Sequence, residues 1–205
     1  MASQYGEDEV LLKYFNQKPN GILVDVGAAD GVENSNSHML ITKYNWKGIL
    51  IEPHPLYAKS LLNLYKDNKN VAIYEIAVYN KQCQLPFYIF GDPTEAQVST
   101  LDETFKQRVI VRHGNKFQPP ITVECDTLTN ILDKLHCPAN IDFLSVDCEG
   151  ADLVALQSLD WKKYVVDLVC VEHSMPIEEL KAYMDGIGFD MYYQTGGNTF
   201  FVRKK

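Results

Sequence analysis

The order of apolar and amphipathic stretches constrains the fold of this chain most strongly. Short apolar runs alternate with stretches of helical length over most of the sequence. This alternation is typical of a largely parallel sheet with crossover helices. The apolar runs are rich in Val, Ile and Leu, as strands buried on both faces should be. The clearest expected strands are Ile22 to Val26, Gly48 to Ile51, Val71 to Ile76, Ile141 to Val146 and Val165 to Val171.

The stretches between these runs carry apolar residues three and four positions apart, which predicts helices. The expected helices are Ser37 to Tyr44, Tyr57 to Tyr65, Thr127 to Leu135, Ala151 to Leu159 and Ile177 to Ile187. The end of the chain departs from the alternation. Gly188 to Gln194 and Asn198 to Arg203 are expected to be strands joined by a turn at Thr195, Gly196 and Gly197. The sequence therefore predicts an α/β fold closed by a terminal hairpin.

The length and composition favour one compact domain over residues 1–205. The chain has 205 residues, of which 46% are hydrophobic, which is enough to bury a core. Residues 91–120 are different, because they are polar and weakly periodic and follow a hairpin-like pair of short strands. We expect this segment to be a mobile loop or lid.

Charge and cysteine content limit the classes of partner and the compartment. The formal net charge is −8, with 27 acidic residues against 19 Lys and Arg, which disfavours a nucleic-acid substrate. The N-terminal residues are acidic, and no apolar run is long enough to span a bilayer. The five cysteines are scattered and odd in number, which favours reduced thiols. A cytoplasmic protein without a membrane span is expected.

The strongest local signal is the turn of small residues that follows the first expected strand. Gly27 and Gly31 allow a close approach of the backbone to a ligand, and the following helix would offer free N–H groups. The dinucleotide fingerprint is incomplete, because Ala29 and Val32 occupy two of its glycine positions. The turn therefore predicts a nucleotide-type site but argues against a nicotinamide-dependent dehydrogenase, the weakest of three candidate functions.

Glu52 ends the second expected strand, where a nucleotide ribose would present two hydroxyl groups. A carboxylate can accept a hydrogen bond from each hydroxyl. Glu52 is therefore a candidate ribose ligand.

Three ordered motifs make the chain resemble the FkbM family of S-adenosylmethionine-dependent methyltransferases. They are Asp25-Val26-Gly27-Ala28-Ala29-Asp30-Gly31, followed by Ser35-Asn36-Ser37; Trp46-Lys47-Gly48-Ile49-Leu50-Ile51-Glu52-Pro53; and Phe143-Leu144-Ser145-Val146-Asp147-Cys148-Glu149-Gly150-Ala151-Asp152. The resemblance extends over nearly the whole chain apart from residues 91–120. It implies a Rossmann-like class I methyltransferase with a seven-stranded, mostly parallel sheet and an antiparallel last strand.

The resemblance also implies how S-adenosylmethionine would be bound. Its methionine end would lie against Asp25, Gly27, Ala28 and Gly31, and its ribose would bind Glu52. Its adenine would lie near Pro53 and His54 on one side and Ala77 and Val78 on the other. Asp147 is a further candidate for the amino group of the cofactor.

Three acidic residues and one histidine follow the fourth and fifth expected strands, Ile141 to Val146 and Val165 to Val171, and they are the catalytic candidates. Asp147 and Glu149 follow one strand, and Glu172 and His173 end the next. Methyl transfer to an oxygen needs alignment of the reactants and removal of a proton. The four side chains could act as a base or could bind Mg²⁺, and the sequence leaves both roles open.

The basic residues between Thr104 and Lys116 suggest an acceptor partner. From Thr104 to Lys116 the only charged side chains are Lys106, Arg108, Arg112 and Lys116, and His113 is close by. We hypothesise that this segment folds over an anionic small-molecule or glycan acceptor. The leading functional prediction is O-methylation of a hydroxyl, with family tendency pointing to a sugar of a glycan or secondary metabolite. The alternative from another class is a catalytically inactive binding protein with the methyltransferase fold.

Overall fold

The computed structural model describes residues 3–91 and 96–204, and its largest element is a seven-stranded sheet. The strand order is β3-β2-β1-β7-β8-β10-β9; β10 is antiparallel to both of its neighbours, β8 and β9, and the other pairs are parallel. The strands are β1 (Ile22–Val26), β2 (Lys47–Ile51), β3 (Val71–Tyr74), β7 (Asn140–Val146), β8 (Val165–Glu172), β9 (Phe189–Gln194) and β10 (Asn198–Arg203). The predicted α/β class and the antiparallel last strand are confirmed.

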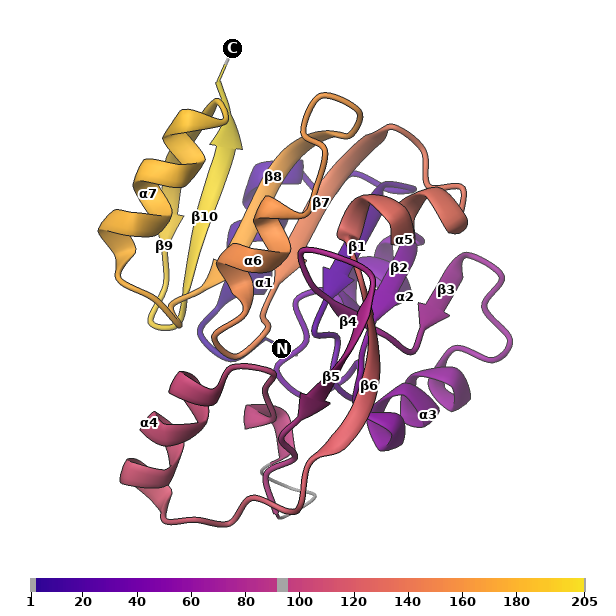
Figure 1. Cartoon of the computed structure of the whole chain (residues 1–205). Coiled ribbons are helices and arrows are strands. Elements are labelled where there is room, and N and C mark those ends of the chain that lie inside the picture. The colour runs from indigo at the N-terminus through magenta and orange to yellow at the C-terminus, as the bar shows by residue number, and fades with distance from the viewer. Residues whose placement is uncertain (1–2, 92–95, 205) are drawn as a thin grey trace.

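Two layers of helices cover the sheet, and each encloses a separate apolar core (Figure 1). One core joins the sheet to α5 (Leu128–Lys134), α6 (Asp152–Gln157) and α7 (Ile177–Gly186). The other joins it to α1 (Glu7–Phe15), α2 (His38–Tyr44) and α3 (Pro55–Leu64). Both faces of the central strands are therefore largely buried, as their content of Val, Ile and Leu predicts.

A second, three-stranded sheet lies beside the large one. It consists of β4 (Ala77–Val78), β5 (Cys83–Phe87) and β6 (Ile121–Asp126), in the order β4-β6-β5. The strand predicted to end at Ile76 ends at Tyr74, and the chain then turns into β4. The burial of β6 alternates along its central residues, so it lacks the continuous apolar run that identifies the central strands.

The segment between residues 91 and 120, expected to be a mobile loop or lid, contains helical structure that its sequence pattern did not predict. It contains the 3₁₀ turn η1 (Ala96–Val98) and the helix α4 (Glu103–His113), and Figure 1 shows α4 beyond the edge of the large sheet. Residues 92–95 of the expected loop lie outside the described residues. The side chain of Asp102 accepts a hydrogen bond from the backbone N–H of Phe105 at 2.6 Å, a normal N-cap. Only Val109 of α4 is fully buried, so the apolar stripe that identifies a core helix is nearly absent.

The strand directions bring distant residues together at one edge of the sheet. The parallel strands β1, β2, β7 and β8 end at the same edge. The antiparallel β10 starts there, because Asn198 pairs with Glu172 at the end of β8. In the part of the chain that the structure describes, no helix has the length and apolar character needed to cross a membrane.

Candidate active site

A cavity of about 400 Å³ opens at the carboxyl ends of the parallel strands. Its walls come from the ends of β1, β2, β7 and β8, from the start of β10 and from one face of α4. Such a crevice outside the carboxyl ends of strands is the usual ligand site of open α/β sheets. The glycine turn after β1 and the acidic residues after β2, β7 and β8 all line it.

The turn after β1 is shaped by close contact with the neighbouring strand. Gly27 has φ of 82°, and a Cβ atom there would lie 1.8 Å from the carbonyl oxygen of Asp147. Only glycine fits this position, because the nearest obstacle is backbone that cannot rotate away. Asp25, Gly27 and Ala28 line the cavity as expected.

Gly31 does not line the cavity, although the sequence suggested a cofactor contact. Its φ is 77°, and an added Cβ atom would lie 2.4 Å from a side-chain carbon of Leu61 in α3. Gly31 is therefore required for packing against a helix. Asp30 stabilises the same turn, since its side chain accepts hydrogen bonds from the backbone N–H groups of Val32 and Glu33.

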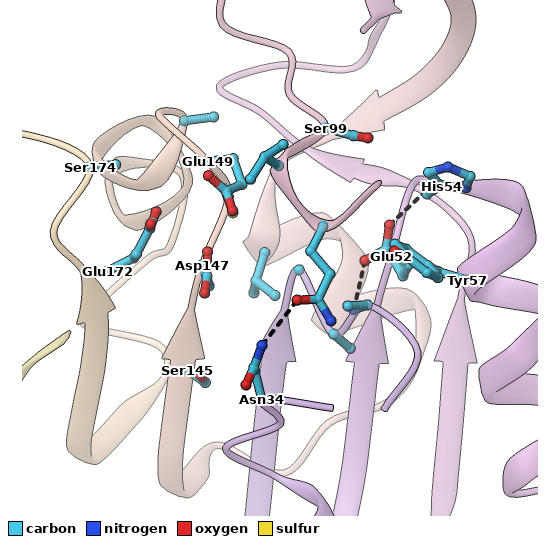
Figure 2. Close-up of a pocket in the computed structure, with 18 of the residues that line it drawn as sticks. Asn34, Glu52, His54, Tyr57, Ser99, Ser145, Asp147, Glu149, Glu172 and Ser174 are labelled. Atoms are coloured by element: carbon cyan, nitrogen blue, oxygen red, sulfur yellow. Dashed lines mark hydrogen bonds between the residues drawn. The ribbon is translucent and has the colours of Figure 1, made fainter. Parts of the chain in front are cut away.

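Glu52 is held at the end of β2 by two backbone N–H groups. Ala29 donates to one carboxylate oxygen at 2.8 Å and His54 donates to the other at 2.7 Å, as Figure 2 shows. The side chain is 5% exposed. Burial raises the pKa of this carboxyl to about 7, while the two N–H donors act in the opposite direction. Glu52 therefore faces the cavity with a fixed orientation and titrates near neutrality.

Apolar and aromatic residues line the cavity next to Glu52. The expected adenine contacts Pro53, His54, Ala77 and Val78 all lie in its wall. The ring of His54 lies 4.8 Å from that of Tyr57, measured between centroids. The Nδ1 atom of His54 accepts a hydrogen bond from the backbone N–H of Leu56 and so caps α3. This part of the wall suits a flat aromatic ligand.

A group of carboxyl side chains lines the opposite end of the cavity (Figure 2). Asp147 and Glu149 follow β7, and Glu172 ends β8. Burial, followed by repulsion from neighbouring carboxylates, raises the pKa of all three carboxyls. Glu149 has a positive φ of 51°, a conformation that is rare outside glycine and is common at functional sites. The hydroxyl of Thr100 donates a hydrogen bond to the Glu149 carbonyl at 2.6 Å.

Asp152 holds this acidic turn in place. One of its oxygens accepts a hydrogen bond from the Cys148 N–H at 2.7 Å, and the other accepts one from the Gly150 N–H at 3.2 Å. The hydroxyl of Ser174 also donates to Asp152. Asp152 thus connects the residues after β7 with those after β8, and it does not line the cavity.

Four residues are candidates to bind Mg²⁺, and among the described residues only Asp147 and Glu172 of these four belong to a compact group of possible metal ligands. Within the described residues, Asp147, Asp152 and Glu172 each place one oxygen within 4.8 Å of the others. The third carboxylate is therefore Asp152 rather than Glu149, and His173 is not part of the group. The Nε2 atom of His173 is instead 2.6 Å from the hydroxyl oxygen of Thr199. Burial lowers the pKa of His173.

Three polar side chains in the cavity wall have a buried oxygen without a hydrogen-bond partner among the described residues. They are Asn36, Glu172 and Asn198. Buried acceptors are normally satisfied, so these oxygens indicate that a ligand with N–H or O–H donors belongs in the cavity.

Sequence reasoning missed several residues of the cavity wall. Tyr5, Tyr57, Phe105 and Asn198 are examples. Tyr57 lies one turn after the predicted adenine contacts, and this spacing could have identified it. Asn198 and Tyr5 reach the cavity only through the pairing of β10 with β8 and through packing against Gly196 and Gly197.

Comparison with known proteins identifies the family and supports the fold. The family model described as methyltransferase FkbM domain matches residues 25–192. The crystal structure of methyltransferase FkbM from Methylobacillus flagellatus KT is similar over 91% of this chain and 44% of that protein, with a TM-score of 0.52 and 15% identity. This chain thus spans less than half the length of that protein.

Two further solved structures share the fold. The METTL16 methyltransferase domain is similar over 96% of this chain and 64% of its own, with a TM-score of 0.52 and 12% identity. TrmK of M. capricolum, in complex with S-adenosyl-homocysteine, is similar over 98% of this chain and 68% of its own, with a TM-score of 0.50 and 7% identity. No curated protein sequence matches the chain.

Proposed function

This chain belongs to the methyltransferase FkbM family, and from that premise we propose that it transfers a methyl group from S-adenosylmethionine to a hydroxyl group of an acceptor. The acceptor class that we propose is a sugar of a glycan or secondary metabolite. S-adenosylmethionine supplies an activated methyl group on a positively charged sulfur. The chain's own residues must bind this cation, orient the acceptor and remove the hydroxyl proton.

The observation that carries the proposal is a concentration of carboxyl groups in the cavity wall that lack cationic partners among the described residues. The wall contains the carboxyl groups of Asp25, Glu52, Asp147, Glu149 and Glu172. None of them forms an ion pair with a Lys, Arg or His side chain in the described residues. Burial raises the pKa of each. A ligand that brings positive charge would offset the cost of ionising them.

S-adenosylmethionine fits this wall because it carries a sulfonium and an ammonium group. Asp25 and Asp147 are the candidate partners of its amino-acid end, and the unpartnered oxygen of Asn36 is a candidate acceptor for the ammonium. Glu52 would accept the ribose hydroxyls, and His54, Tyr57, Ala77 and Val78 would surround the adenine. The structure of TrmK holds S-adenosyl-homocysteine in a related fold, which supports the same class of ligand.

A nicotinamide dinucleotide fits the same wall poorly. Its pyrophosphate would bring two negative charges to the turn after β1, where Asp25, Glu33 and Glu52 are the acidic side chains that line the cavity. No Lys or Arg of the described residues lines this part of the cavity. Repulsion between like charges therefore disfavours the dehydrogenase alternative.

Glu149 is the residue that we propose as the base. Its carboxyl group points into the cavity beside Asp147 (Figure 2), and its raised pKa makes it a stronger proton acceptor than an ordinary glutamate. The strained backbone at Glu149 is held by Thr100 and by the hydrogen bonds of Asp152 to the same turn. Asp147 and Glu172 would orient the acceptor hydroxyl toward Glu149.

A divalent cation is the second candidate role of this acidic group, because Asp147, Asp152 and Glu172 place three oxygens within 4.8 Å of one another. Carboxylates are the ligands that Mg²⁺ prefers. The two oxygens of Asp152 already accept hydrogen bonds from Cys148, Gly150 and Ser174, which favours proton transfer by Glu149 over metal assistance. Chelation distinguishes the two mechanisms.

Calorimetric titration tests the proposal directly. We expect S-adenosylmethionine and S-adenosyl-homocysteine to bind and NAD not to bind. Transfer of radiolabelled methyl to a panel of sugars and glycosylated metabolites then identifies the acceptor. Tight binding of the cofactor without transfer to any hydroxyl would favour the inactive binding protein, and binding of NAD alone would contradict the proposal.

A further inference from the structure

The helix α4 presents one face to the cavity. Phe105, Arg108, Val109 and Arg112 line the cavity and are three or four residues apart, so they lie on one side of the helix. Lys106 and Lys116 do not line it. Two of the four Lys and Arg side chains of this segment therefore face the cavity and two do not, and His113 also lines it.

The position of α4 places this face above the acidic group. A Cβ atom at Gly150 would lie 2.7 Å from the Cβ of Phe105, so the helix contacts the turn that follows Asp147. The guanidinium of Arg108 donates a hydrogen bond to the Ser174 carbonyl at 2.9 Å, which connects α4 to the end of β8. The region between α4 and the carboxyl groups of Glu149 and Glu172 therefore lies at the ends of β7 and β8, and β1 separates it from Glu52 at the end of β2.

Neither arginine on this face forms an ion pair with an acidic side chain within the described part of the chain. Arg108 binds a neutral carbonyl, and its guanidinium carbon lies 5.1 Å from the centroid of the Phe105 ring. Arg112 makes no hydrogen bond or ion pair within residues 3–91 and 96–204. Lys106, by contrast, pairs with Glu103 at 3.1 Å. In a chain with a net charge of −8, two cations that line the cavity and have no carboxylate partner among the residues that the structure describes form a local site for an anion.

We propose that the acceptor carries an anionic group, a carboxylate or a phosphate, which Arg112 binds with the support of Arg108 while the acceptor hydroxyl faces Glu149. This inference rests on the proposed function and adds the charge of the acceptor and the residue that recognises it. Arginine suits this role because its planar guanidinium can donate two parallel hydrogen bonds to either group.

Binding of an anion to the protein saturated with S-adenosyl-homocysteine tests the proposal without turnover. Inorganic phosphate is titrated calorimetrically into the wild type, Arg112→Ala and Lys106→Ala. Lys106→Ala is the matched control, because it removes the same charge from the same helix outside the cavity. We expect Arg112→Ala to weaken phosphate binding about tenfold or more and Lys106→Ala to change it less than about twofold. Equal affinities for phosphate in all three proteins, or no binding to the wild type, would overturn the proposal.

Glucose 6-phosphate, glucuronic acid and glucose then distinguish the source of the anionic group in the same titration. Stronger binding of the phosphorylated sugar identifies a phosphate, and stronger binding of the sugar acid identifies a carboxylate. Equal binding of all three would overturn the proposal. Failure of S-adenosyl-homocysteine to bind at the start would instead contradict the proposed function, so the two failures are distinguishable.

Discussion

Replacement of Glu52 by glutamine tests both the electrostatics of the cavity and the ribose assignment. The carboxyl is buried, and its pKa is raised from 4.5 to about 7. The folded protein therefore holds a proton that the unfolded chain releases above pH 4.5. This bound proton stabilises the folded state. Its contribution to the free energy of unfolding is complete at low pH and is lost as the pH rises through about 7. Glutamine does not titrate and removes this dependence.

The size of the effect follows from the two pKa values. Each pH unit between the two pKa values corresponds to about 1.4 kcal/mol of unfolding free energy. The proton on Glu52 therefore contributes about 3 kcal/mol at low pH, and about 2.5 kcal/mol of this is lost between pH 5 and pH 8. Glutamine also loses one acceptor for the N–H groups of Ala29 and His54, which costs about 1–3 kcal/mol at every pH. The difference in unfolding free energy between wild type and Glu52→Gln should therefore decrease by about 2.5 kcal/mol from pH 5 to pH 8.

Denaturant unfolding of the ligand-free proteins at the two pH values measures this difference. Glu9→Gln is the control, because Glu9 is exposed on α1, and its difference from wild type should stay constant. At pH 8, Glu52→Gln should also bind S-adenosylmethionine about 10–100-fold more weakly, since a charged acceptor for the ribose hydroxyls is lost. A pH-independent stability difference, together with unchanged cofactor affinity, would refute the reasoning.

The other predictions concern the turns, the base and the metal. Gly27→Ala should lower the melting temperature and abolish cofactor binding, because the new Cβ would collide with the Asp147 carbonyl; a normally folded variant in calorimetry would contradict this. Glu149→Gln should lower kcat about 10²–10⁴-fold with little change in cofactor affinity, and a normal rate would exclude Glu149 as the base. Asp152→Asn should reduce both stability and kcat, since a carboxylate acceptor of the Asp147–Gly150 turn is lost; Asp185→Asn, at an exposed ion pair, is the control. Treatment with EDTA should change the rate less than about twofold, and a loss restored by Mg²⁺ would establish the metal-assisted mechanism instead.

The sequence predicts the central sheet well because its strands are buried on both faces. Residues 22–26 and 165–171 are apolar runs, each interrupted by one aspartate, and they form β1 and most of β8. The strand β6 and the helix α4 were missed for the same physical reason. Both are largely exposed on one side, so burial imposes little pattern on their residues.

The sequence predicts those residues of the candidate site whose place in the cavity follows from their position at the end of a strand. Glu52 and Asp147 lie at strand ends that the apolar pattern locates, and both line the cavity. Gly31 shows the limit of this reasoning. A glycine in a turn indicates that space is short, but the sequence does not say whether a ligand or a side chain such as Leu61 occupies that space. The role of Asp152 likewise depends on a tertiary contact with Ser174.

A crystal structure of the protein with S-adenosyl-homocysteine tests the central claim most directly. We predict that the adenosyl group lies between the turn at Gly27 and the His54 side chain, with both ribose hydroxyls within about 3 Å of the Glu52 carboxylate oxygens. A ligand bound elsewhere, or a ribose out of hydrogen-bonding range of Glu52, would contradict the account.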